Sequence, residues 1–149
     1  NWWQKVPANL RVSPVLARMA ARHFQALGET GLALNIVVQA LEHEWDTLLL
    51  EIFGDPTLHA APGMLLKHIQ LAESWLPAHA RDAALLLALA RLCQAQQLWG
   101  KARSYAEASL AIEPSAMAHL ILASLAEQDG SPEAAAPHLR QALALALDA

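Results

Sequence analysis

Seven histidines are the side chains of this sequence best suited to binding a metal ion or haem. No two of them lie four residues apart with a glutamate between, as the helical zinc motif requires. We therefore expect structural or surface roles for them, and we predict neither a metal nor a cofactor. His119 falls at an expected core position, where a packed and hydrogen-bonded imidazole is the simplest interpretation. The histidines are His23, His43, His59, His68, His79, His119 and His138.

Cys93 is the single cysteine, so an internal disulfide and a metal cluster made of cysteines alone are excluded. Its spacing is that of a buried residue in a helix, whereas a reactive thiol needs exposure and a cationic setting or a helix N-terminus. No string of residues indicates a nucleophile with a base beside it, and no Gly-x-Gly-x-x-Gly turn follows a strand. The sequence predicts a protein that is not an enzyme.

The composition predicts an all-α protein without affinity for nucleic acid. Of 149 residues, 55% are hydrophobic, 5% aromatic and 16% charged. Much of the apolar content is Ala and Leu, which favour helices over strands. The net charge of −4 provides no basic field for a phosphate backbone. The best apolar run, from Ala83 to Ala90, is far shorter than the roughly 20 residues of a membrane span.

A repeat of two helices organises most of the chain. Its clearest copy begins at the N-cap Asp82, breaks at Gln96–Gln97 and ends at Pro114, which cannot continue a helix. Copies start near residues 14, 46, 83 and 116, a period close to that of tetratricopeptide repeats. We predict a tetratricopeptide-repeat solenoid of about four antiparallel helix pairs, in a right-handed superhelix. It spans residues 14–149, and residues 1–13 are a linker or the remnant of a preceding repeat.

Helical spacing also predicts the core and the helix ends. Ser13 and Ser131 are expected N-caps, and Pro77 is expected to end the second repeat. Pro137 lies inside the last helix, so we expect a bend near Glu133. The expected core is Ala17, Ala20, Ala21, Phe24, Ala33, Val37 and Ala40, then Leu49, Ile52, Phe53, Leu65, Ile69 and Ala72, then Leu86, Leu89, Ala90, Cys93, Ala102, Ala106 and Ser109, and finally His119, Leu122, Ala123, Ala126, Ala135, Leu139 and Ala142, with Trp2, Trp3, Val6 and Leu10 packed on the first repeat. The segment Gly54–Gly63 interrupts the second repeat.

Three strings resemble the bacterial HemY family: "WQKVPANLRVSP", "EWDTLLLEIFG" and "LLLALARLCQAQQLWGKARSYAEASLAIEPS". The resemblance covers most of the chain. It implies the soluble, cytoplasmic-facing part of a bacterial inner-membrane protein, anchored by an N-terminal segment outside this sequence. It also implies a scaffold linked to haem or porphyrin biosynthesis, with protein or peptide partners that include haem-synthesis enzymes. The alternative is a module that binds haem or porphyrin in the concave groove of the repeats. If haem is a ligand, His59 and His68, near the irregular loop, are the better ligand candidates.

The binding surface of such a repeat protein is the concave wall formed by the first helix of each pair. The expected groove residues are Arg18, Arg22, Gln25, Leu87, Arg91, Gln94, Met117, Leu120 and Ser124, with Thr47 and Leu50 in the interrupted repeat. Arginine binds carboxylates with two hydrogen bonds, so the arginines are expected to hold acidic groups of a partner. Ordinary solvated charges are the alternative. We expect Trp99 and Tyr105 to pack between neighbouring repeats.

Overall fold

The computed structural model describes residues 1–148, which form nine α-helices, two short 3-10 helices and no strands. About 80% of the chain is helical. The predicted all-α class is therefore confirmed. The chain divides into two compact units, a first unit of Asn1–His68 and a second unit that begins at Ile69.

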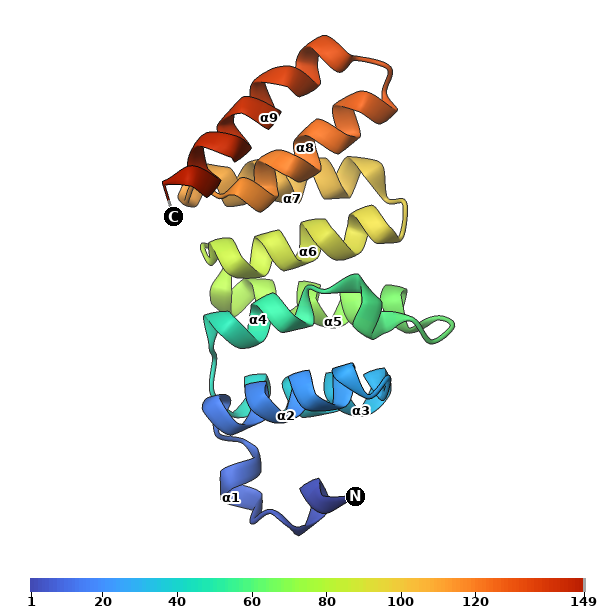
Figure 1. The fold of residues 1–149 in the computed structure, drawn as a ribbon, viewed down its shortest axis with the longest axis vertical. Coiled ribbons are helices and arrows are strands. Elements are labelled where there is room, and N and C mark those ends of the chain that lie inside the picture. The colour runs from blue at the N-terminus through green and yellow to red at the C-terminus, as the bar shows by residue number, and fades with distance from the viewer. Residues whose placement is uncertain (149) are drawn as a thin grey trace. The chain divides into compact units, whose positions relative to one another are not determined.

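The first unit is built on one antiparallel pair, α2 (Pro14–Ala26) and α3 (Thr30–His43) (Figure 1). The short helix α4 (Thr47–Phe53) packs against both members of the pair. Three smaller elements complete the unit, namely η1 (Trp2–Lys5), α1 (Ala8–Arg11) and η2 (Pro56–His59), the last of which packs on α3.

The second unit contains two further antiparallel pairs. Helix α6 (Ala83–Ala95) packs on α7 (Trp99–Ile112), and α8 (Ala116–Gln128) packs on α9 (Pro132–Leu147) (Figure 1). Helix α8 also contacts both α6 and α7. Helix α5 (Met64–His79) begins in the first unit, and its residues from Ile69 onward form the first helix of the second unit.

The same turn joins the two helices of three pairs. Gly28, Gln97 and Gly130 each have a positive φ, of 80°, 64° and 79°. In each case the next backbone amide donates a hydrogen bond of 2.8–2.9 Å to the carbonyl oxygen five residues earlier. The three bonds run from Glu29 to Phe24, from Leu98 to Cys93 and from Ser131 to Ala126. This left-handed turn satisfies carbonyls that a helix end leaves without partners. The predicted breaks at Gly28 and Gln96–Gln97 are confirmed.

Helices α4, α6 and α8 each begin with a side-chain cap. Asp46, Asp82 and Ser115 each accept a hydrogen bond from a backbone amide of the helix that follows, at 2.9–3.2 Å. Ser13 and Ser131 occupy the expected N-cap positions, but neither side chain makes a cap hydrogen bond. Proline follows each of these two serines, so the first amide of the helix is already absent and one less donor needs a cap.

Most of the predicted core is buried, and the exceptions lie mainly in the last pair. All of the predicted core positions in the first and third repeats are buried. In contrast, Leu139 is 43% exposed, and Leu65, His119 and Ala126 are only half-buried. Helix α8 buries Ala118, Ile121 and Leu125 instead. Leu139 lies on a side of α9 that no described element covers.

One predicted helix end and one predicted contact need correction. Helix α5 continues through Pro77 and ends two residues later, at His79, so Pro77 lies in its last turn. Helix α9 is continuous through Pro137. At the N-terminus, Trp3 is buried and Trp2 stacks on Phe24 with ring centroids 5.6 Å apart, but Leu10 is exposed. None of the helices in residues 1–148 combines the length and hydropathy of a membrane span.

Candidate functional site

Two of the predicted groove residues on α2 are engaged within the protein. The guanidinium of Arg18 donates to the carboxylate of Asp46 at 3.1 Å, and that carboxylate also caps α4. The side-chain amide of Gln25 donates to Asp55 at 2.9 Å, at the N-cap of η2. Both side chains therefore connect α2 to the interrupted repeat, and the guanidinium of Arg18 is already engaged in an ion pair within the protein.

The remaining groove positions of the first unit differ in exposure. Arg22 lies one turn beyond Arg18 on α2 and is exposed, as Thr47 is at the start of α4. Leu50 is fully buried, so its assignment to an exposed surface is wrong. The reason is that α4 packs against both α2 and α3, which covers two of its sides.

The groove positions of the second unit lie on the exposed sides of two helices that contact each other. We call the surface formed by Leu87, Arg91, Gln94, Met117, Leu120 and Ser124 the α6–α8 face. Leu87, Arg91 and Gln94 are half-buried on α6, spaced so that they share one side of the helix. Met117 and Leu120 on α8 are 40% and 45% exposed. This face combines apolar side chains with one cation.

A polar cluster fastens α7 to α5 behind this face. Glu73 of α5 accepts hydrogen bonds from the hydroxyl of Tyr105 at 2.5 Å and from Lys101 at 3.0 Å. The hydrogen bond from Tyr105 lowers the pKa of Glu73, and burial together with Glu73 raises the pKa of Tyr105. The prediction that Tyr105 packs between neighbouring repeats agrees with this contact, whereas Trp99 is exposed.

Cys93 is buried inside the second unit, as its spacing predicts. Burial raises the pKa of its thiol to about 11, so the thiolate is scarce at neutral pH. This residue has the character of a core side chain.

His59 and His68, the candidate haem ligands, form a compact cluster with Phe53. The two imidazole centroids are 5.0 Å apart, and the Phe53 ring meets both edge-on. The Nε2 of His59 contacts the carbonyl oxygen of Phe53 at 2.7 Å. Burial lowers the pKa of His59 to about 4 and lowers the pKa of His68 as well. Both rings are therefore neutral at neutral pH.

The cavity beside this cluster is small. It measures about 230 Å³ and is lined by His68 and Lys67 together with residues of α3 and η2, whereas cofactor sites usually enclose roughly 300–1,000 Å³. His59 is 3% exposed, and its Nε2 already has a partner. These features favour a structural role, in which the histidines hold the irregular segment between α4 and α5.

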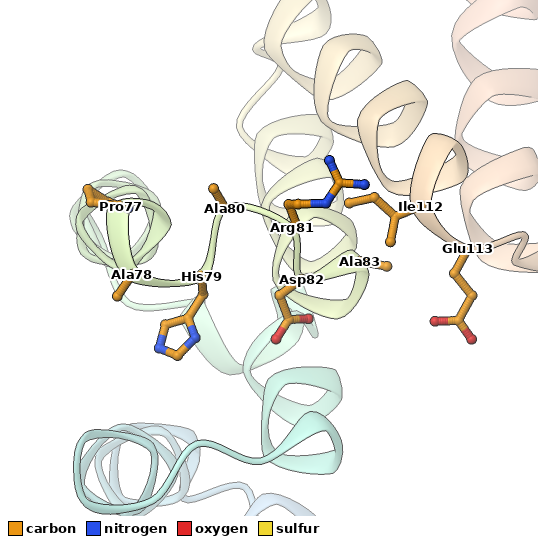
Figure 2. A pocket seen from close by; sticks show the side chains of 9 residues that line it. All are labelled: Pro77, Ala78, His79, Ala80, Arg81, Asp82, Ala83, Ile112 and Glu113. Carbon is orange, nitrogen blue, oxygen red and sulfur yellow. The ribbon is translucent and has the colours of Figure 1, made fainter.

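An open hollow of about 650 Å³ lies at the turn between α5 and α6, beside the end of α7 (Figure 2). His79, Arg81, Asp82 and Glu113 contribute its polar side chains. Asp82 already accepts two amides at the start of α6, and Figure 2 shows the guanidinium of Arg81 beside Ile112. The arrangement offers no nucleophile with a base.

A second histidine pair was not predicted from the sequence pattern. His119 on α8 and His138 on α9 bring their Nδ1 atoms within 2.9 Å of each other. They lie 19 residues apart, so no spacing rule for a single helix relates them. The one sequence signal that could have predicted this contact is that the two histidines lie on the two helices of one pair, before and after the Gly130 turn.

Comparison with known protein families and with curated proteins gave no match to this chain.

Proposed function

We propose that this chain is a non-catalytic scaffold of tetratricopeptide-type helix pairs that binds a segment of another protein along the α6–α8 face. The observation that carries the proposal is the recurrence of one building block. Three helix pairs share the same left-handed turn, at Gly28, Gln97 and Gly130. Because a repeated unit stacks its first helices side by side, their outward positions form a continuous binding wall.

The pairing of helices supports this assignment within each unit. In the second unit, α8 contacts both helices of the preceding pair, and in the first unit α4 contacts both α2 and α3. Small buried residues lie on the second helices, such as Ala102, Ala106 and Ser109 on α7. Small side chains let neighbouring helices approach closely, as stacked helix pairs require.

The chemistry of the α6–α8 face indicates the kind of segment that fits. Met117 and Leu120 expose apolar surface beside Leu87, and Arg91 adds a cation. Methionine adapts its shape to different apolar partners, and arginine pairs with carboxylates. We infer a partner segment that carries two or three apolar side chains.

The test compares matched substitutions on two surfaces. Leu120→Glu places a charge on the α6–α8 face, and Leu143→Glu places the same charge on α9, where Leu143 is 61% exposed. Each purified variant is used as bait in a bacterial extract, and the captured proteins are quantified by mass spectrometry. We expect Leu120→Glu to lose specific partners at least tenfold and Leu143→Glu to keep them. Equal capture by Leu120→Glu and the unaltered chain would refute the proposal.

The resemblance to HemY extends the proposal to haem synthesis. We propose that the partners of this scaffold include enzymes of haem or porphyrin biosynthesis at the bacterial inner membrane. The same experiment tests this extension separately. Partners that depend on Leu120 but include no such enzyme would refute the link to haem synthesis and leave the scaffold proposal standing.

A further inference from the structure

His119 and His138 face each other across the last helix pair. Their Nδ1 atoms are 2.9 Å apart, their ring centroids are 5.2 Å apart, and the rings are tilted by 38°. Both side chains are half-buried, so solvent reaches the pair. The tight turn at Gly130 joins α8 to α9, and the packing of these two helices brings the two imidazoles together.

The contact needs one Nδ1 that carries a proton and one Nδ1 that does not. One Nδ1 carries the proton and the other accepts it through its lone pair, since two protonated nitrogens would repel each other. Burial, followed by the nearby His138, lowers the pKa of His119. At neutral pH the His119 imidazole is therefore in the form that binds metal ions.

The spacing of the nitrogens matches a metal with ligands at right angles. Imidazole nitrogens bind divalent transition metals at about 2.0–2.1 Å. Two such bonds that end 2.9 Å apart enclose an angle of about 90° at the metal. A tetrahedral zinc ion would instead separate the nitrogens by about 3.3 Å. Right angles are typical of square-planar and tetragonal Cu²⁺ and Ni²⁺.

We propose that His119 and His138 form a two-histidine site for a divalent transition metal of tetragonal geometry, Cu²⁺ or Ni²⁺, with water in the remaining positions. No group of three or more His, Cys, Asp or Glu in residues 1–148 is arranged to hold a metal ion. The site thus supplies two protein ligands and binds more weakly than a closed structural site.

Metal binding requires that neither Nδ1 carries a proton. Two waters leave the hydrated ion, and each is replaced by one Nδ1 lone pair. The proton that one Nδ1 carries in the free pair moves through solvent to the Nε2 of the same ring. Both imidazoles are then neutral, each with its proton on Nε2.

The other close histidine pair lacks these properties. His59 is almost fully buried, and its Nε2 is occupied by the carbonyl of Phe53. A hydrated ion has no access to that ring without opening the irregular segment. This contrast assigns the metal site to α8 and α9.

The test is a calorimetric titration of the untagged chain with Cu²⁺, with Ni²⁺ and with Zn²⁺. The variants are His119→Gln and His138→Gln, and the matched control is His43→Gln, which changes an exposed histidine on α3. We expect one ion per chain in the unaltered protein and the control, with affinity at least tenfold lower in either pair variant. Circular dichroism checks that each variant keeps its helix content.

Electron paramagnetic resonance of the Cu²⁺ complex of the unaltered chain gives a readout that needs no variant. Two coordinated imidazole nitrogens are expected in its hyperfine pattern. Affinity unchanged in His138→Gln, or a spectrum without two nitrogens, would overturn the proposal. Tighter binding of Zn²⁺ than of Ni²⁺ would overturn the tetragonal geometry.

Discussion

Acid should weaken the first unit through His59. This imidazole is 3% exposed, and burial lowers its pKa from 6.5 to about 4. The folded state therefore resists a proton that the unfolded chain accepts. Well above pH 6.5 neither state is protonated at His59, and the contribution of this residue to stability is fully present. As the pH falls from 6.5 towards 4, the unfolded chain binds a proton at this residue and the contribution of His59 to stability is lost.

The size of this loss follows from the two pKa values. The full difference between 6.5 and about 4 corresponds to about 3 kcal/mol, reached below pH 4. At pH 5 the unfolded chain is almost fully protonated at this site and the folded state is about one-tenth protonated. The expected loss between pH 7 and pH 5 is then about 2 kcal/mol.

Urea unfolding at pH 7 and pH 5 measures the effect, with circular dichroism as the signal. His59→Gln removes the titrating group and keeps a donor for the carbonyl of Phe53. We expect this variant to lose about 2 kcal/mol less than the unaltered chain over the same interval. His43→Gln, on the exposed side of α3, should behave like the unaltered chain. If His59→Gln shows the full acid loss, burial of His59 does not cause it.

Three further substitutions test single contacts by urea unfolding. Gln97→Gly should raise the free energy of unfolding by about 0.5–1 kcal/mol, because Gln97 has a φ of 64° that glycine adopts without strain; no gain would show that the turn is unstrained. Tyr105→Phe should cost about 1–2 kcal/mol through the lost hydrogen bond to Glu73, and it should raise the pKa of Glu73 in an NMR titration, whereas an unchanged titration would contradict the assignment. Asp46→Ala should cost about 1–2 kcal/mol, more than Arg18→Ala, because it removes a helix cap as well as an ion pair; the reverse order would be inconsistent with capping.

Helix boundaries were predictable wherever a local signal fixes the backbone. Asp82 ahead of an apolar run and Gly28 after one each specify a helix end through a side-chain cap or a positive φ. Leu139 is a residue whose burial such local signals do not predict. Its spacing is that of a core residue, but burial depends on whether another element covers that side of α9, and the local sequence does not contain this information.

The candidate site was harder to predict than the helix boundaries. A residue on the expected side of a helix can already be bound to another part of the same chain, and is then not free to bind a partner. Arg18 is on the predicted side of α2, yet a carboxylate 28 positions later in the chain binds it. The His119–His138 contact likewise joins two helices. Both contacts are set by tertiary packing, which a pattern within one helix does not report.

The two hydrogen bonds from α2 also bear on the order in which the first unit folds. Helix α4 has seven residues, about two turns, and helices shorter than about 12–15 residues are marginal in water. Arg18 holds the residue before α4, and Gln25 holds Asp55 just after it. The α2–α3 hairpin can form from local contacts, whereas α4 must wait for that hairpin. Amide hydrogen exchange should therefore reveal residues 46–59 as one cooperative segment, which opens before its neighbours and whose protection falls when Gln25 is replaced.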